Sequence, residues 1–118
     1  MVNLTYQLRQ IKPQDNSVLR EVYADAIKSQ AFLLYSKKQV DAWSSLAWVP
    51  GVLDRPLSEG KGWLSFNEEG IEAFALRFPH DRLALLYCRG RSARRGHATA
   101  LLKKLELDAI EELSLIHI

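Results

Sequence analysis

The stretch from residue 83 to residue 110 most limits how this chain can fold, because it joins an apolar run, a basic turn and an amphipathic segment. Residues 83–88 are continuously apolar, which is typical of a short strand covered on both faces. Residues 89–98 contain four arginines and two glycines. From Ala98 onward, apolar residues recur at helical spacing, at Leu101, Leu102, Leu105 and Ala109. The pattern predicts a strand, a turn and then a helix.

A glycine-containing turn that opens a helix is suited to binding an anion. The first amides of a helix have no intrahelical acceptors, and the helix dipole places partial positive charge there. The small residues Gly96 and Ala98 would let a ligand approach the backbone closely. We therefore expect a phosphate or pyrophosphate site in this turn. The alternative is an ordinary connection whose arginines are solvated.

Residues 86–88 and 94–102 together resemble the acyl-CoA motif of the GNAT superfamily, the CoA-dependent N-acetyltransferases. That motif is usually written Gln/Arg-x-x-Gly-x-Gly/Ala; Gly96 and Ala98 fill its small positions, and Ala93 stands at the first. The resemblance implies that acetyl-CoA binds as a cosubstrate, with turn amides on the pyrophosphate and the preceding strand on the pantetheine arm. The cofactor-binding residues implied are Leu86, Tyr87, Cys88, Arg91, Arg94, Arg95, Gly96, His97, Ala98 and Thr99.

Composition fits one small domain. The 118 residues are 47% hydrophobic and 25% charged, as in ordinary globular proteins, and the net charge of +2 makes the basic turn a local feature. One cysteine excludes an internal disulfide and suits a reducing cytoplasm. We expect a cytoplasmic protein without a membrane span, because no apolar run approaches about 20 residues. No cluster has metal-ligand spacing, so no metal is expected.

The rest of the chain predicts the order strand, two helices, three strands and a helix. Ser36 and Gln39 form a capping box that starts the second helix, and the turn signal before Gly70 predicts a hairpin. The expected elements are a strand at 4–11, a first helix that has Pro13 and Asp15 at its start and ends near Ser29, a second helix from 36, a loop at 52–61, and strands at 62–66 and 70–78. This order is similar to that of a GNAT domain, an α+β, α/β/α sandwich-like fold with a mixed sheet.

The final residues predict the start of one more strand, at 113–118, after a helix that ends near residue 111 or 112. The resemblance implies further strands and a helix beyond it. We therefore interpret residues 1–118 as a single incomplete GNAT-like domain that lacks its C-terminal strands and helix. Because an incomplete sheet exposes backbone groups and apolar surface, we expect a homodimer, with exchanged C-terminal strands as one form.

Glu72 is the candidate catalytic base. By alternation it shares a strand face with Phe74 and Leu76, where desolvation would raise its pKa. The alternative, which we prefer, is a surface strand residue. Cys88 is interpreted as a small buried hydrophobe rather than a nucleophile.

Tyr35 and Trp48 are candidates for the amine-binding site, because the first two helices and their loop usually cover it in the family. Trp43 is expected in the core. Acidic residues near these loops are a weak attraction for a cationic amine; they are Asp41, Asp54 and Glu59.

The resemblance thus implies an acetyl-CoA-dependent N-acetyltransferase that acts on an unidentified primary amine. One alternative is a truncated, inactive fragment that binds CoA or only oligomerises. Another is a nucleic-acid binder that uses the arginine turn, which would require a wider basic face than this near-neutral chain offers.

Overall fold

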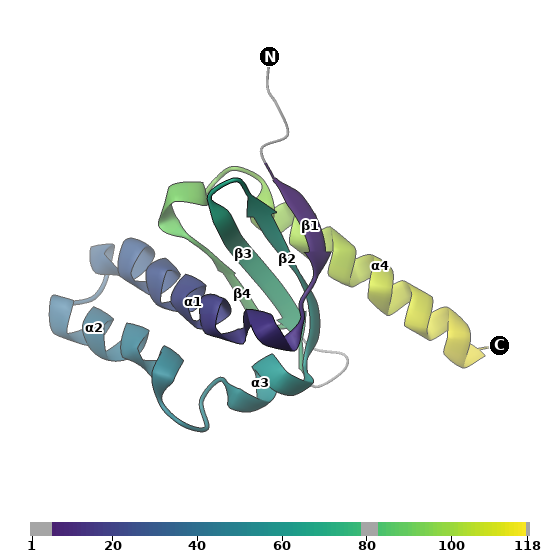
Figure 1. The fold of residues 1–118 in the computed structure, drawn as a ribbon, viewed down its shortest axis with the longest axis horizontal. Coiled ribbons are helices and arrows are strands. Elements are labelled where there is room, and N and C mark those ends of the chain that lie inside the picture. The colour runs from purple at the N-terminus through teal and green to yellow at the C-terminus, as the bar shows by residue number, and fades with distance from the viewer. Residues whose placement is uncertain (1–5, 79–82, 118) are drawn as a thin grey trace, which may run out of the picture.

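A four-stranded antiparallel sheet lies between helices on both of its faces in the computed structural model, which describes residues 6–78 and 83–117 (Figure 1). The strands follow one another across the sheet in sequence order. They are β1 (Gln7–Gln10), β2 (Lys61–Asn67), β3 (Gly70–Arg77) and β4 (Leu83–Cys88). The helices are α1 (Asn16–Gln30), α2 (Lys37–Ser45), α3 (Asp54–Glu59) and α4 (His97–His117). Short 3₁₀ turns include η2 (Ala31–Leu33), η3 (Leu46–Trp48) and η4 (Gly90–Ser92).

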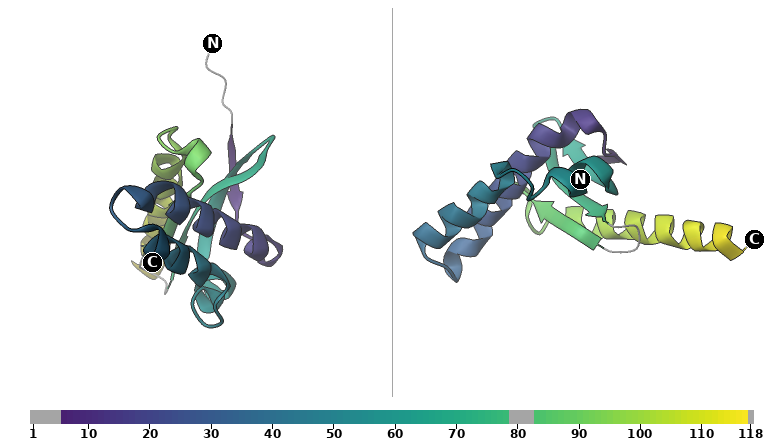
Figure 2. Two further views of the ribbon diagram at one scale, coloured as in Figure 1. Left: turned by 90° about the vertical axis from the view of Figure 1, so that its left-hand side faces the viewer. Right: turned by 90° about the horizontal axis from the view of Figure 1, so that it is seen from below.

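The two faces of the sheet are covered by different helices, so the fold has three layers (Figure 2). On one face, Leu64, Phe74 and Leu76 pack against Leu19 and Val22 of α1 in the larger core. On the other face, α4 buries a smaller core, formed by Ala73, Ala75, Leu101 and Leu105. β4 contributes to both cores, with Leu85 and Tyr87 on the α1 side and Leu86 and Cys88 on the α4 side. The expected strand with two covered faces is confirmed.

Local sequence signals explain where the elements begin. The predicted capping box at the start of α2 is present: Ser36 Oγ accepts a hydrogen bond from the Gln39 amide at 3.2 Å, and Gln39 Oε1 accepts one from the Ser36 amide at 2.9 Å. The predicted hairpin is the β2–β3 pair. The α+β class is therefore confirmed, and the expected elements occur in the expected order with α3 added before β2. The described strands are all antiparallel, where a mixed sheet was expected.

Three boundaries differ from the sequence-based expectation. The expected loop at 52–61 contains α3, and the first strand is described as Gln7–Gln10, with residues 4 and 5 outside the described part. The strand expected at 113–118 is wrong, because α4 continues to His117; Ile118 lies outside the described residues. No glycine or proline follows Gly96, so nothing in the sequence stops a helix rich in leucine and glutamate. The exchange of C-terminal strands therefore loses its structural basis.

Within residues 6–78 and 83–117, no helix is both long and apolar enough to cross a membrane.

Candidate functional site

The basic turn between β4 and α4 is tied down by a buried carboxylate, Glu72 of β3. Glu72 is 0% exposed and accepts hydrogen bonds from Arg91 Nε at 2.8 Å, from Arg91 Nη2 and from the hydroxyl of Ser92. The β2–β3 register shifts beside it: Ser65 pairs with Ala73 and the next residue of β2 pairs with Ile71, which leaves Glu72 as the extra residue of a bulge. Bulges change the direction of side chains locally, and this one accompanies a carboxylate that contacts η4.

The protonation of Glu72 follows from these partners. Burial is the largest single influence and by itself would raise the pKa of the carboxyl group. The hydrogen bonds from Arg91 and Ser92, together with the positive charge of Arg91, outweigh it and hold the pKa below its usual value. The expected rise in the pKa of Glu72 is therefore wrong, and so is the alternative that Glu72 is a surface residue, because Glu72 is fully buried.

A second contact ties the same turn to the C-terminal end of α1. Asp25 accepts a hydrogen bond from the Gly90 amide at 3.0 Å and lies 3.5 Å from Nη1 of Arg89. A Cβ atom on Gly90 would lie 2.5 Å from the Cβ of Ser29, so only glycine fits against α1 here. Two of the four turn arginines, Arg89 and Arg91, are thus paired with carboxylates of the protein.

The segment from Arg94 to the start of α4 has an unusual backbone. Arg94 has a φ angle of 63° and Gly96 one of 89°, both in the left-handed region that favours glycine. The Ala100 amide donates to the Gly96 carbonyl at 3.0 Å, which is the first turn of α4. The amides of His97, Ala98 and Thr99 stand ahead of that bond, in the positions where a helix offers no intrahelical acceptor. This geometry presents main-chain donors and partial positive charge at one place.

His97 fixes the start of α4 to the sheet. Its ring is buried, its Nδ1 lies 2.7 Å from the hydroxyl of Ser65 in a hydrogen bond, and it stacks on Tyr6 with ring centroids 4.0 Å apart. The Tyr6 hydroxyl also donates to the Gly96 carbonyl at 3.3 Å. Burial lowers the pKa of His97, and the charge of Arg95 adds to this effect while Glu72 opposes it. The imidazole is therefore neutral, and it packs against Tyr6 while its hydrogen bond with Ser65 fixes the start of α4.

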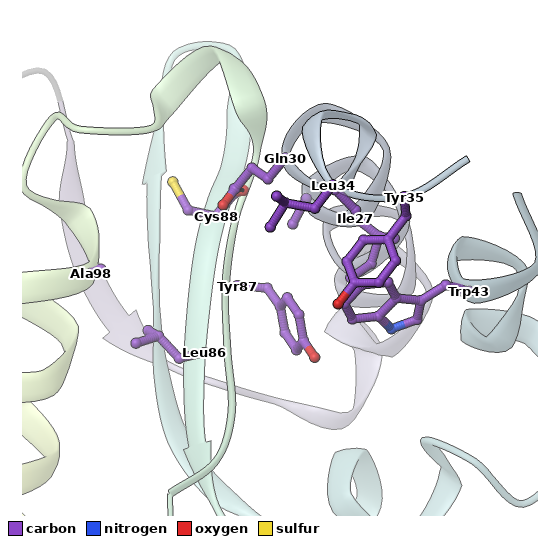
Figure 3. A pocket seen from close by; sticks show the side chains of 11 residues that line it. Ile27, Gln30, Leu34, Tyr35, Trp43, Leu86, Tyr87, Cys88 and Ala98 are labelled. Atoms are coloured by element: carbon purple, nitrogen blue, oxygen red, sulfur yellow. Dashed lines mark hydrogen bonds between the residues drawn. The ribbon is translucent and has the colours of Figure 1, made fainter. Parts of the chain in front are cut away.

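Two adjoining cavities lie along the edge of β4. The first, of about 560 Å³, is lined by six of the predicted cofactor-binding residues: Cys88, Arg94, Gly96, His97, Ala98 and Thr99. The second, of about 470 Å³, includes Leu86 and Tyr87 of β4 together with Tyr35 and Trp43. Gln30, Cys88 and Ala98 line both cavities, so together the two form one groove from the turn to α2. In Figure 3, Ala98 and Leu86 lie on one side of the second cavity and Tyr35 and Trp43 on the other.

The groove follows a strand edge that no other described strand covers. β4 is the last strand of the sheet, and it pairs only with β3 among the residues described. The Cys88 carbonyl points outward from this edge and accepts a hydrogen bond from Nε2 of Gln30 at 3.3 Å. Burial, with smaller contributions from Glu72 and Asp25, raises the pKa of the Cys88 thiol, so the thiol is protonated at neutral pH.

The structure brings together most, but not all, of the predicted site residues. Arg91 is engaged by Glu72, and Arg95 is exposed and belongs to the lining of neither cavity. Trp48 lies in a separate hollow with Asp25 and Arg89, away from Tyr35. Trp43, expected in the core, is 37% exposed and meets Tyr35 edge to face at 5.7 Å between ring centroids.

Solved structures with this fold are N-acetyltransferases of the GNAT family, and the resemblance expected from the turn is confirmed at the level of the fold. A GCN5-related N-acetyltransferase from Rhodopseudomonas palustris matches with a TM-score of 0.82 and 26% identity, over 95% of this chain and 70% of that one. The PaiA N-acetyltransferase from Thermoplasma acidophilum, in complex with coenzyme A, matches with a TM-score of 0.71 and 18% identity, over 92% and 74%. An aminoglycoside acetyltransferase from an uncultured soil metagenomic sample matches with a TM-score of 0.60 and 17% identity, over 92% and 74%. No family model and no curated protein matches the sequence.

Proposed function

We propose that this protein transfers an acetyl group from acetyl-CoA to the nitrogen of a primary amine. One observation carries the proposal: the two left-handed residues and the start of α4 line a cavity that adjoins the uncovered edge of β4. A neighbour with the same fold is in complex with coenzyme A, which supports CoA-dependent chemistry.

The residues present fit a diphosphate group. Gly96 and Ala98 leave the backbone accessible, and the amides of residues 97–99 supply donors. The guanidinium of Arg94 is exposed and lines the same cavity. In the proposal this end of the groove holds the pyrophosphate, and the outward main-chain groups at Leu86 and Cys88 bond the pantetheine arm.

The reaction needs a bound amine, a donor for the developing oxyanion and a proton for the leaving thiolate. Acetyl-CoA supplies the activated acyl group: the amine nitrogen bonds to the carbonyl carbon, the carbon–sulfur bond breaks, nitrogen releases one proton to solvent, and the leaving thiolate takes one up. An outward amide of β4 is the proposed oxyanion donor. Burial, and to a smaller extent Tyr23, raises the pKa of Tyr87, so its hydroxyl is a proton donor in the cavity. Glu72 is occupied by Arg91 and Ser92, and we assign it an anchoring role instead of the base.

The proposal is tested by calorimetry with CoA and with pantetheine, which lacks the diphosphate. Arg94→Gly removes the charge and also relieves the left-handed backbone, so the fold is retained. We expect about tenfold weaker CoA binding and unchanged pantetheine binding, because one charge-assisted hydrogen bond is worth roughly 1.5 kcal/mol. Arg55→Ala is the matched control: Arg55 is exposed and pairs with Glu59 on α3, away from the groove. A folded wild-type protein that gives no heat with millimolar CoA would overturn the proposal.

The nucleic-acid alternative loses support from the pairing of the turn arginines. Arg89 and Arg91 pair with Asp25 and Glu72, so only Arg94 and Arg95 of the turn arginines have no carboxylate partner among the described residues. A binder of nucleic acid needs a broader basic face. The inactive-fragment alternative predicts CoA binding without turnover of any amine.

A homodimer in a reducing cytoplasm belongs to the same proposal. The exposed apolar residues Leu107 and Ile110 of α4 form the surface that favours self-association, because the edge of β4 is given to CoA in this proposal. The compartment is inferred from the single cysteine.

A further inference from the structure

We infer that the amine acceptor is a small monoamine with an apolar body, and not a polycation. The inference rests on the proposed function and assigns the acceptor to the side of the second cavity formed by Tyr35 and Trp43, because the pantetheine arm lies along Leu86 and Cys88 on the other side. It follows from what lines that cavity, and from where the nearby carboxylates are directed.

The walls of the cavity are aromatic and aliphatic. Tyr35 and Trp43 meet at an interplanar angle of 85° and form a corner, and Tyr87 lies across from them (Figure 3). Leu34 and Ile27 complete this part of the lining. The volume of about 470 Å³ lies within the range of small-molecule sites, roughly 300–1,000 Å³. Such a surface favours an apolar body, and the aromatic faces can attract one ammonium group.

The cavity contains no carboxylate among the described residues that line it; besides the two tyrosines and the indole N–H of Trp43, its polar side chains are those of Gln30 and Cys88. The acidic residues once expected to attract a cationic amine all have other partners. Asp41 pairs with Lys37 at 3.0 Å, Asp54 with Arg20 at 2.8 Å, and Glu59 with Arg55 at 3.0 Å.

This charge distribution separates monoamines from polyamines and aminoglycosides. Each further ammonium group that enters an apolar cavity loses hydration and gains no counter-charge there, so binding becomes less favourable with every added charge. A single ammonium group can be attracted by the aromatic faces of the wall before it releases its proton to solvent and attacks the thioester as the neutral amine. The cavity is open at Tyr35, which is 46% exposed, so the acceptor can enter from solvent.

The test measures acceptor binding without CoA, so that it stands apart from the test of the proposed function. Phenethylamine, spermidine and kanamycin are titrated into the full chain and followed by saturation-transfer NMR and calorimetry. We expect phenethylamine to bind, and spermidine and kanamycin to give no saturable binding. Trp43→Ala should weaken phenethylamine binding at least about tenfold, whereas Trp48→Ala, in the separate hollow, should leave it unchanged.

A second variant keeps the test decisive if Trp43→Ala fails to fold. Leu34 is 84% exposed and lines the cavity, so Leu34→Glu adds a carboxylate with little effect on packing. It should weaken phenethylamine binding and create spermidine binding. Val49→Glu makes a similar change at an exposed position outside both cavities and should do neither.

The results that would overturn the acceptor class differ from those that would overturn the proposed acetyl transfer. Saturable spermidine or kanamycin binding by the wild type, or phenethylamine binding that Trp43→Ala and Leu34→Glu leave unchanged, would overturn the acceptor class while CoA binding still stood. Tighter binding of octanoyl-CoA than acetyl-CoA, lost in Leu34→Glu, would also overturn it, because the cavity would then hold an acyl chain. Failure of CoA to bind while phenethylamine binds would remove the proposed function and leave the cavity's preference for apolar monoamines in place.

Discussion

Glu72 is the residue on which the shape of the turn depends most. It holds Arg91 and Ser92 from a fully buried position, and so decides which turn arginines remain for a ligand. The side chain of Arg91 is half exposed, so the pair is screened by water on one side only. Breaking a buried, hydrogen-bonded pair by removing one partner is costly because the remaining groups stay unsatisfied.

We predict that Glu72→Ala lowers the free energy of unfolding by about 3 kcal/mol at pH 7, near the low end for a buried pair. The pKa of Glu72 is lowered in the folded state, so its contribution is fully present above the unfolded value of about 4.3 and is lost as the pH falls through the folded value. Urea denaturation from pH 7 to pH 2 measures both effects. The stability difference between the two proteins should shrink at acid pH.

The matched control is Glu69→Gln, because Glu69 is exposed and lies 3.5 Å from the same arginine. An exposed pair contributes at most about 1 kcal/mol. If Glu69→Gln destabilised the protein as much as Glu72→Ala, the anchor would not be Glu72.

At the scale of elements, the junction between the turn and α4 depends on a neutral histidine. His97 joins the helix to β2 through Ser65 and to the N-terminal segment through Tyr6. Because burial lowers its pKa, the folded state favours the neutral ring, whereas the unfolded chain takes up a proton at about pH 6.5.

We predict that the free energy of unfolding decreases as the pH falls from about 6.5 to the lower pKa of His97 in the folded protein. In that pH range the unfolded state binds more protons than the folded state. His97→Asn should remove this part of the pH dependence. Ser65→Ala loses the hydrogen bond and keeps the titrating ring, so its slope should persist. An unchanged slope in His97→Asn would contradict the assignment.

Features that depend on neighbouring residues could be predicted from the sequence, whereas contacts between distant residues could not. The strand, the glycine turn, the capping box at Ser36 and the hairpin were predictable, because each depends on residues a few positions apart. Trp43 was misjudged because helical spacing marks one face of α2, and the same spacing serves a core and a cavity wall alike. The partners of Glu72 lie 19 and 20 residues away, so no local pattern indicates them. α4 was predicted too short because residues 113–118 were interpreted as the start of a strand, although no stop signal separates them from the helix.

At the scale of the whole molecule, exposed apolar surface lies on α4 as well as beside the cavity. Leu107 and Ile110 are 57% and 60% exposed and stand three residues apart, on one side of the helix. We predict a concentration-dependent dimer that Leu107→Glu combined with Ile110→Glu converts to monomer, because like charges would then meet across the interface. Sedimentation equilibrium at micromolar protein measures this. Leu46→Glu, at an exposed position outside α4, is the control.

A wild-type protein that sediments only as a monomer would remove this prediction and leave the groove as described.

The contact of Asp25 with Gly90 has a consequence for how the two ends of the groove behave. Asp25 belongs to α1, and α1 ends in Gln30, which lines both cavities. One helix therefore contacts both the glycine turn and the second cavity. A ligand that orders the glycine turn would therefore also reduce the motion of Tyr35 and Trp43. A ligand that binds afterwards in the second cavity would lose less conformational entropy. Affinity for each molecule should then rise in the presence of the other, and by an equal factor.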